Sequence, residues 1–337
     1  MHGALQSLVK KVDAAHPFTF IDVGAMGGIA AKWDVLEDAM KIIAFEADER
    51  EYKKLKNTDR VTYLNYLVYG GKQDLTFYIA RKPGDSSLFS PNKSVIAQFP
   101  EAERYDTIDK VFVPSAKVCA FDTLVQEGKI KGVDFMKLDT EGCEMSILEG
   151  ARHLLLPELF GLQVEVEFIQ KGENQPVFRH VDELLDREGF QLIDLKRQFW
   201  KRRNFTDYVG KGQLTFGDTL YFKKIEVLRD HLALNKNIPG YAVSKVHKAI
   251  LACLVYRVFD YAAAVADMAL EQNYFTRQEH GRAVENIWTY ASCGVLPEFP
   301  GKGFFYKIFR KAAELTKPFS YRGWSDSDRY IGNIRDI

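Results

Sequence analysis

The segment Phe20-Ile-Asp-Val-Gly-Ala-Met-Gly-Gly28 decides the fold of this chain, together with Glu46, which follows Gly24 by 22 residues. The segment predicts an apolar strand that ends in a tight glycine turn, and a second strand, Lys41–Ala47, carries Glu46. Glycines let the backbone approach a ligand, and a carboxylate about 20 residues further on accepts hydrogen bonds from ribose hydroxyls. The spacing therefore indicates a site for a nucleotide-type cofactor. A turn that only closes a βαβ unit is the alternative.

The residues of the glycine turn indicate which cofactor it holds. A dinucleotide site requires G-x-G-x-x-G, and Met26 stands where the second glycine would be. The pattern Asp22-x-Gly24-x-Met26-x-Gly28 instead resembles the D-x-G-x-G-x-G loop of S-adenosylmethionine-dependent methyltransferases, with Met in place of the middle glycine. This resemblance implies that Asp22, Gly24, Met26 and Gly28 bind the cofactor.

The composition is that of a globular protein with a large core. Apolar residues make up 46% and aromatic residues 13% of the 337 residues, which excludes wholesale disorder. Lys+Arg and Asp+Glu balance at 46 each, so the formal net charge is zero. A neutral chain does not favour a whole-chain electrostatic grip on nucleic acid, and we expect no nucleic-acid partner.

The cysteines and the N-terminus favour a cytoplasmic protein with reduced thiols. The four cysteines lie far apart without a C-x-x-C motif, so neither a zinc site nor a disulfide framework is expected. The N-terminus lacks the basic-then-apolar order of a signal peptide. The most apolar run, Ala249–Phe259, is too short to span a bilayer and predicts a buried helix. The oligomeric state is left open.

Strand and helix patterns alternate up to about residue 224. The strand candidates are Phe18–Val23, Lys41–Ala47, Val61–Leu67, Val133–Asp139, Gly161–Ile169, Gln191–Leu195 and Thr219–Lys223. The helix candidates between them are Ile29–Met40, Asp48–Asn57, Cys143–Leu155 and Pro176–Arg187. The first, second and fourth strands are almost continuously apolar, as a parallel sheet covered on both faces requires. The pattern predicts a doubly wound α/β sheet.

Two regions lie outside this alternation. An insertion before the fourth strand holds two extended segments, Asp74–Arg81 and Ile108–Val118. Beyond residue 224 the pattern is helical, with Tyr241–Gln272, Gln278–Ser292 and Phe304–Thr316 as predicted helices. We therefore divide the chain into a cofactor-binding domain, 1–224, and a helical C-terminal extension, 225–337. The aromatic and basic residues of the last helix suit a membrane surface, although such a helix more often packs its aromatic stripe on the domain.

The end of the fourth strand carries several acids in the run Lys137-Leu-Asp-Thr-Glu-Gly-Cys-Glu144. Ligands of open α/β sheets bind at the carboxyl ends of the strands, so we expect Asp139 beside the glycine turn. Asp139 is then a catalytic or cofactor-contacting residue, or only a helix cap. The capping interpretation is stronger for Glu141 and Glu144. Lys137 is expected to form an ion pair with one of these acids.

A longer stretch around Asp139 resembles a known family. The run Val133-Asp-Phe-Met-Lys-Leu-Asp-Thr-Glu-Gly-Cys-Glu-Met-Ser-Ile-Leu-Glu-Gly-Ala151 is similar to the K-x-D-x-E-G-x-E-x-x-x-L-x-G-A signature of FkbM-type methyltransferases. Further matches are Ile21-Asp-Val-Gly-Ala25, Phe45-Glu-Ala-Asp48 and Phe121-Asp-Thr-Leu124. The likeness spans roughly residues 18 to 224. It implies a class I (Rossmann-like) methyltransferase fold, mostly parallel with an antiparallel seventh strand, and S-adenosyl-L-methionine as the cofactor.

The resemblance also implies O-methylation of a hydroxyl on a sugar, glycan or secondary metabolite. A hydroxyl is a poor nucleophile at neutral pH, so a general base is expected. Asp139 is one candidate, and Glu165 on the fifth strand is another, because the family pattern also places a carboxylate there. An ion pair with Lys137 or Arg179 is the alternative role for Glu165. Two acids without a third clear ligand are thin evidence for a cation, so no metal is expected.

Several other residues are candidates for binding. Glu46 is expected to hold the cofactor ribose, and Asn65, just past the third strand, to contact the adenine edge. Ser87 belongs to the loop Asp85-Ser-Ser-Leu88, which matches the family's short serine motif by position. An ordinary Ser/Asp turn is the alternative for this loop.

A basic and aromatic cluster, Lys196–Phe205, follows the sixth strand. If the seventh strand is antiparallel, this connection crosses the carboxyl edge of the sheet, on the acceptor side. We therefore expect Trp200, Arg202 and Arg203 to bind a small-molecule or saccharide acceptor, since guanidinium groups and an aromatic platform suit anionic or sugar ligands. A solvated hairpin is the alternative.

The sequence thus favours a cytoplasmic O-methyltransferase that uses S-adenosyl-L-methionine. Two other functions stay open at this point. One is an NAD-type oxidoreductase, against which Met26 counts. The other is a binding module that has kept the cofactor fold without its chemistry.

Overall fold

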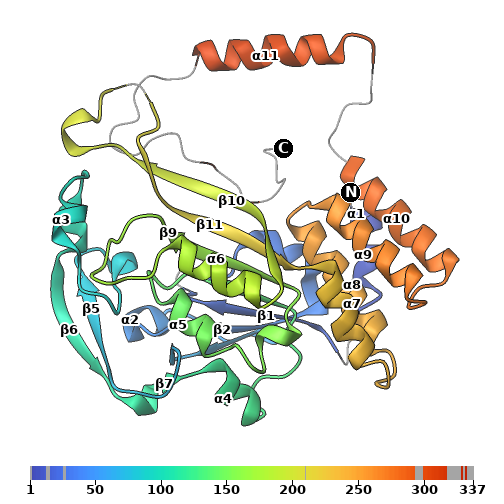
Figure 1. Cartoon of the computed structure of the whole chain (residues 1–337), viewed down its shortest axis with the longest axis horizontal. Helices are drawn as coiled ribbons and strands as arrows, with labels where there is room; N and C mark the ends of the chain where they lie inside the picture. The colour runs from blue at the N-terminus through green and yellow to red at the C-terminus, as the bar shows by residue number, and fades with distance from the viewer. Residues whose placement is uncertain are drawn as a thin grey trace.

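The computed structural model describes residues 2–12, 16–25, 28–208, 210–292, 299–316, 328 and 331. A seven-stranded sheet forms its centre (Figure 1). The strands are β1 (Phe18–Val23), β2 (Met40–Phe45), β3 (Val61–Leu64), β8 (Phe135–Leu138), β9 (Gly161–Glu167), β10 (Phe190–Trp200) and β11 (Gln213–Lys223). Their order is β10-β11-β9-β8-β1-β2-β3. β11 is antiparallel to both of its neighbours, and the other paired strands are parallel. The expected sheet is confirmed.

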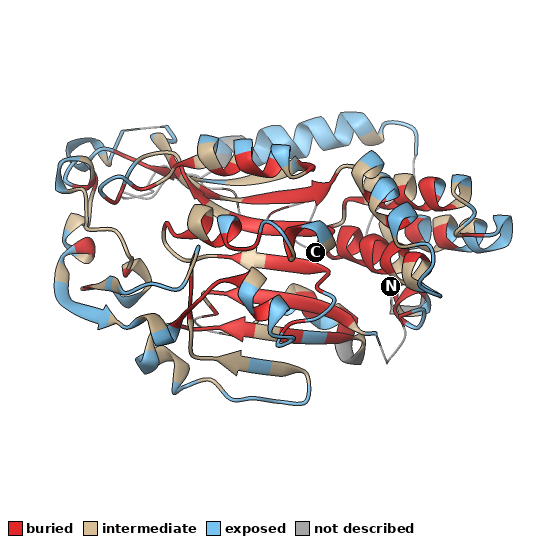
Figure 2. Cartoon of the chain, turned by 60° about the horizontal axis from the view of Figure 1, so that its bottom comes forward, coloured by how far each residue is buried: buried red, intermediate tan, exposed pale blue. Residues whose placement is uncertain are grey.

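Alternate residues of the central strands face two separate cores, as the two-residue period of a strand requires. Phe18 and Phe20 of β1 and Phe135 of β8 belong to the first core. Ile21 and Val23, which follow Phe20 and point to the opposite face, belong to the second. The strands are accordingly buried along most of their length (Figure 2). The sheet is therefore covered on both faces.

The second core contains the short helices that follow the strands in sequence. These are α4 (Phe121–Gln126), α5 (Glu144–Glu149) and α6 (Phe178–Arg187). In α6 the residues Val181, Leu184 and Leu185 are buried, which is the one-sided pattern of an amphipathic helix.

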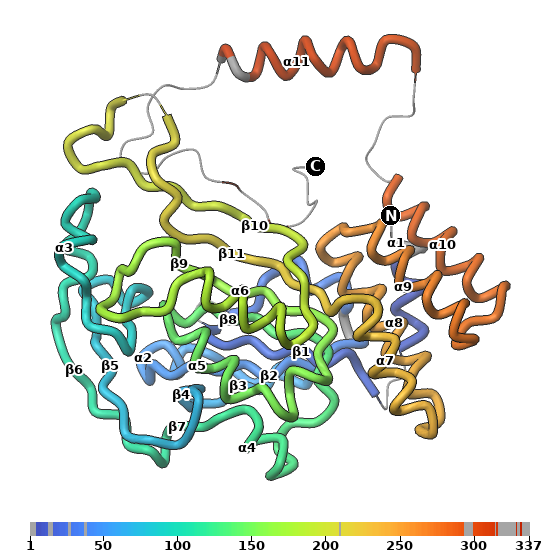
Figure 3. Tube along the Cα trace, in the orientation of Figure 1, coloured from blue at the N-terminus to red at the C-terminus, as the bar shows by residue number. Residues whose placement is uncertain are grey.

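The first core is built largely by helices from the two ends of the chain. They are α1 (His2–Val9), the 3₁₀ helix η1 (Ala31–Ala39), α7 (Ile225–Leu234), α8 (Tyr241–Val255), α9 (Phe259–Glu271) and α10 (Arg277–Ser292). Tyr256, just after α8, stacks on Phe135 with 5.4 Å between ring centroids and meets Trp33 edge-on at 5.9 Å. Figure 3 shows α1 beside α10, where Asn286 donates a hydrogen bond to Ser7. One core therefore contains residues from both sides of residue 224.

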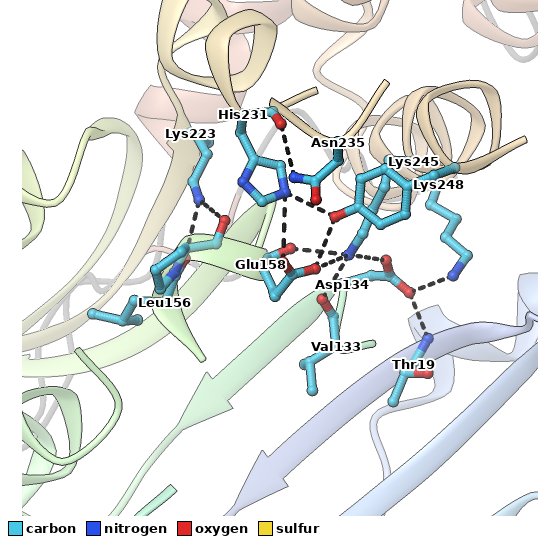
Figure 4. A network of polar contacts seen from close by, with 12 residues as sticks. Thr19, Val133, Asp134, Leu156, Glu158, Lys223, His231, Asn235, Lys245 and Lys248 are labelled. Atoms are coloured by element: carbon cyan, nitrogen blue, oxygen red, sulfur yellow. Dashed lines mark hydrogen bonds and ion pairs between the residues drawn. The ribbon is translucent and has the colours of Figure 1, made fainter. Parts of the chain in front are cut away.

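A buried ionic network attaches α8 to the start of β8 (Figure 4). The carboxylate of Asp134 lies 3.0 Å from the ammonium of Lys245 and 3.0 Å from that of Lys248. It also accepts a hydrogen bond from the backbone N–H of Thr19. Lys245 donates further bonds to the carbonyls of Val133 and Glu158. Because all three charged groups are buried, each needs these partners.

The insertion forms a separate wall beside the carboxyl end of β2. β5 (Leu75–Ala80) pairs antiparallel with β6 (Thr107–Val113). The loop between them holds two 3₁₀ turns and the short helix α3 (Lys93–Ile96). β4 (Leu67–Val68) and β7 (Val118–Cys119) form a second, parallel pair. The two expected extended segments are thus strands.

The structure differs from several expectations about local structure. The region predicted as a helix over Ile29–Met40 is the 3₁₀ helix η1. The single helix predicted over Tyr241–Gln272 is divided into α8 and α9, since Arg257 has a left-handed φ of 57° that no helix accommodates. The sixth strand is longer than predicted, and β10 includes the first half of the basic cluster, up to Trp200.

The last helix, α11 (Lys302–Thr316), lies apart from the rest of the described chain in Figure 1. Its described apolar side chains are exposed, so the expected packing of its aromatic stripe on the domain is not present. Among the described residues, no helix combines the length and apolar character needed to cross a bilayer.

Candidate active site

The ends of β1 and β8 meet at a contact between two backbones. Gly24 has a φ of 82°, and a Cβ atom at this position would lie 1.9 Å from the carbonyl oxygen of Asp139. The N–H of Asp139 donates to the carbonyl of Val23, and the N–H of Gly24 donates to that of Phe45. Only glycine fits such an approach in this conformation.

A cleft of about 220 Å³ opens above this contact. Its lining includes Gly24, Glu46, Ser86, Lys137, Asp139 and Glu141. These residues come from the ends of β1, β2 and β8 and from the loop after β5. The cleft therefore lies at the carboxyl edge of the sheet, where ligands of such folds bind.

Glu46 brings one unsatisfied oxygen to this cleft. Its Oε1 atom accepts a hydrogen bond from the N–H of Asp48 at 2.8 Å. Its Oε2 atom is inaccessible and has no hydrogen-bond partner among the described residues. Burial raises the pKa of Glu46 above its usual value. A buried, unsatisfied acceptor costs free energy unless a donor reaches it.

Lys137 joins the carboxylates of two strands. Its ammonium lies 3.0 Å from Asp139 and 3.5 Å from Asp22, which confirms the expected ion pair. Burial alone would lower the pKa of Lys137, but Asp139 and Asp22 raise it above its usual value. Burial raises the pKa of Asp22 to about 6 despite the nearby Lys137. Asp22 is buried beside this lysine and does not line the cleft.

A second cleft, of about 470 Å³, adjoins the first. Tyr105, Trp200 and Phe216 give it aromatic walls, and Arg104 and Lys171 contribute cations. The two clefts share Glu51, Pro83, Gly84 and Glu141. Glu141 therefore stands at the junction of the two clefts.

Three glutamates and one lysine are gathered at this junction. Glu141, Glu165 and Glu167 each place one carboxylate oxygen within 4.8 Å of the others. The ammonium of Lys171 lies 2.7 Å from Glu167 and 3.2 Å from Glu141. The Oε2 atom of Glu165 is inaccessible and has no hydrogen-bond partner among the described residues. Of the three carboxylates, Glu165 is the one that forms no ion pair with Lys171.

The electrostatics of this group raise the basicity of its carboxylates. Burial raises the pKa of Glu167 to about 8, against the opposing effect of Lys171. Burial, reinforced by Glu141 and Asp139, raises the pKa of Glu165 well above its usual range. The pKa of Glu141 is also raised, chiefly by burial. Three such oxygens suit a hard cation, but the ammonium of Lys171 already lies against two of the three glutamates.

Sequence comparison identifies the family. The methyltransferase FkbM domain matches residues 22–192, which is half of the chain. The chain belongs to the FkbM methyltransferase family. Its cofactor is therefore S-adenosyl-L-methionine, and the NAD-type alternative is left without support. No curated protein matches the sequence significantly.

Solved methyltransferase structures are similar to this FkbM chain at low sequence identity. A methyltransferase FkbM from Methylobacillus flagellatus KT has 13% identity and a TM-score of 0.30, and the match covers 65% of this chain and 58% of that one. TrmK of M. capricolum in complex with S-adenosyl-homocysteine has 10% identity and a TM-score of 0.29, covering 86% and 97%. A 1,6-didemethyltoxoflavin-N1-methyltransferase of Burkholderia thailandensis, with bound S-adenosylhomocysteine, has 14% identity and a TM-score of 0.29, covering 66% and 79%. The fold of this chain, a mostly parallel seven-stranded sheet in which β11 is antiparallel to both of its neighbours, is the class I methyltransferase fold.

The first cleft of the FkbM domain fits this cofactor. The unsatisfied Oε2 atom of Glu46 matches the donors that ribose hydroxyls supply. The close approach of Gly24 to the carbonyl of Asp139 fixes the glycine turn at the edge of this cleft, which both residues line. Two of the expected cofactor residues, Gly24 and Glu46, thus line one cleft with Asp139.

The other described residues that were expected to bind the cofactor do not line that cleft. Asn65 lines an adjoining cleft and donates hydrogen bonds to the carbonyls of Glu46 and Ala47. Ser87 donates to the carbonyl of Glu141 and lines neither main cleft. Gly28 has a φ of 87° and also lies outside the lining. Met26 lies outside the described residues.

The structure places one of the three expected acceptor residues in the second cleft and the other two outside it. Trp200 lines the second cleft and packs edge-on against Phe99. Arg202 donates to the side chains of Gln98 and Gln213, and Arg203 donates to the carbonyl of Phe99. Neither arginine lines the second cleft. Both attach the turn after β10 to the insertion.

Sequence reasoning missed Glu141, Lys171 and Tyr105. Glu141 was expected in the first turn of a helix, but α5 begins only at Glu144. Glu141 instead has a left-handed φ of 56°, immediately before Gly142 at 113°. The Glu-Gly pair directly after a strand was the signal, because two such residues favour a turn over a helix. Lys171 and Tyr105 come from loops, and no sequence pattern placed them here.

Proposed function

We propose that this FkbM methyltransferase transfers a methyl group to a hydroxyl of a saccharide or secondary metabolite. The observation that carries the proposal is the group of basic carboxylates at the junction of the two clefts. A hydroxyl oxygen must lose its proton during methylation, so the site needs a proton acceptor. Glu165 has a raised pKa and lines neither cleft, but one of its carboxylate oxygens lies within 4.8 Å of one on Glu141, which lines both.

The roles of the cofactor residues follow from the first cleft. Bound S-adenosyl-L-methionine supplies a methyl group on a sulfonium centre. Gly24 and Asp139 form the floor on which its amino-acid end would rest, and Glu46 accepts from the ribose hydroxyls. Asn65 orients the backbone after β2 through its bonds to Glu46 and Ala47, toward the adenine side. Alignment of this kind supplies as much as ~7–11 kcal/mol of a barrier.

The acceptor occupies the second cleft in this proposal. Trp200, Tyr105 and Phe216 offer apolar ring surfaces of the kind on which sugar rings pack. Asp139 and Glu165 are the catalytic carboxylates. Glu165 accepts the proton, and Asp139 pairs with Lys137 on the cofactor side of the site. Arg202 and Arg203 act on the acceptor through the loop that they fasten. We expect this reaction in the cytoplasm, with no nucleic acid as substrate.

The proposal is tested first by cofactor binding and then by turnover. Isothermal titration with S-adenosyl-L-methionine and NAD side by side should give binding of the first alone. Release of S-adenosylhomocysteine is then measured with a panel of sugars, phenols and amines. Turnover restricted to hydroxyl acceptors supports the proposal. Turnover with amines alone contradicts the O-methyl assignment, and binding without turnover of any acceptor favours the inactive binding module.

A further inference from the structure

The helix α11 presents an apolar face to solvent. Phe304 is 65% exposed, Phe309 is 69% exposed and Leu315 is 75% exposed. Phe305, Tyr306 and Ile308 are exposed as well. Large exposed apolar patches on soluble proteins mark interaction surfaces. In α6 of the same chain the equivalent stripe is buried in the core.

The residues of α11 are sorted onto two faces. At 3.6 residues per turn, Phe304 and Ile308 are neighbours along one side, and Phe305 and Phe309 lie beside them on the same face. The basic residues Lys307 and Arg310 lie on the other side of the helix by the same spacing, and Lys311 lies at the border, next to Phe304. α11 is therefore an amphipathic helix whose apolar face is broad and aromatic and whose polar face is basic.

The charge of α11 sets it apart from the rest of the chain. Its sequence holds four basic residues, Lys302, Lys307, Arg310 and Lys311, and one acid, Glu314. The whole chain has a formal net charge of zero. Positive charge is therefore concentrated on a helix whose apolar face is exposed.

We propose that α11 binds an anionic lipid surface. A helix with Phe and Leu on one face and Lys and Arg on the other lies in the membrane interface, with its rings at the boundary of the acyl chains. Its basic residues are attracted to acidic headgroups. A second α11 is a poorer partner, because it carries the same net positive charge, whereas acidic headgroups carry the opposite charge. The helix has 15 residues and anchors the protein without spanning the bilayer.

Vesicle flotation of the full chain tests the proposal. Vesicles of phosphatidylcholine with phosphatidylserine should bind it, and vesicles of phosphatidylcholine alone should bind it much more weakly. The variant Lys307→Gln/Arg310→Gln/Lys311→Gln should lower partitioning on the order of 100-fold, from about fivefold per basic residue. Removal of three exposed lysines elsewhere, by Lys53→Gln/Lys54→Gln/Lys56→Gln, is the matched control and should leave most binding in place.

The apolar face is tested in the same assay. Phe305→Ser/Phe309→Ser should reduce binding at least tenfold, whereas Trp288→Ser, which alters a 73% exposed ring on α10, should not. All three positions are exposed, so the variants are expected to fold. Equal binding to both vesicle types, or loss in the controls, overturns the proposal. The proposal is also overturned if the chain binds no vesicles but self-associates, and Phe305→Ser/Phe309→Ser abolishes this self-association. None of these results depends on methyl transfer.

Discussion

The carbonyl oxygen of Asp139 occupies the space beside Gly24, 1.9 Å from where a Cβ atom would stand. This contact joins the end of β1 to the end of β8 and forms the base of the cofactor cleft. The glycine is therefore required by the neighbouring strand as well as by its own φ of 82°. This backbone contact fixes the separation between the glycine turn and Asp139, the proposed catalytic residue.

Replacement of Gly24 by Ala should therefore damage both stability and cofactor affinity. A left-handed non-glycine residue costs of order 1–3 kcal/mol, and the clash with Asp139 adds to it. Gly28→Ala is the matched control, since Gly28 has a φ of 87° but its added Cβ would meet nothing within 4 Å. Thermal unfolding and calorimetry with S-adenosyl-L-methionine measure the two effects. Equal losses in the two variants would show that the contact with Asp139 is unimportant.

The replacement Glu46→Ala should weaken binding of S-adenosyl-L-methionine by ~1.5–3 kcal/mol, the range for hydrogen bonds to a charged group. The unsatisfied Oε2 atom at the cleft is the reason. The control is Glu49→Ala, which removes an exposed carboxylate three residues further on. Unchanged affinity in a folded Glu46→Ala protein would rule out the assignment to ribose.

Much of the central sheet was predictable because its physical signals are local. Apolar runs located β1, β2 and β8, and two-residue alternation correctly joined Lys137 to a neighbouring acid. The division between α8 and α9 was not predictable, since the apolar pattern continues through Arg257. Neither was the position of Glu141, whose left-handed turn depends on the packing of Gly142 against Gln175. Those features are decided by tertiary contacts.

The buried network at the start of β8 gives a stability prediction. Asp134→Ala should lower the free energy of unfolding by about 3–5 kcal/mol, because it removes the carboxylate between two buried lysines. Lys245 would keep its ion pair with Glu158, at 3.5 Å, whereas Lys248 would lose its ion pair. Asp182→Ala is the comparison, since it removes a carboxylate that bonds a tyrosine hydroxyl and pairs with no described cation. Urea unfolding measures the difference. A loss below 1 kcal/mol would mean that α8 is held by its apolar face alone.

The last prediction concerns the proton acceptor. Glu165→Gln keeps the size and hydrogen bonding of the side chain and removes its basicity. If Glu165 accepts the proton, kcat should fall by about 10²-fold or more while cofactor affinity changes little. Glu149→Gln, on the exposed side of α5, is the control and should leave kcat unchanged.

The pH dependence distinguishes a base from a residue that only shapes the site. The pKa of Glu165 is raised by burial, so the carboxylate is protonated at pH values where an ordinary glutamate is ionised. A base must be ionised to act, so kcat should rise with pH through this raised pKa, above the usual carboxyl range. Glu165→Gln should abolish that acid limb along with the rate. If the variant keeps a near-normal kcat and the same acid limb of the pH–rate profile, Asp139 or water accepts the proton instead. Catalysis would then depend mainly on alignment of the substrates.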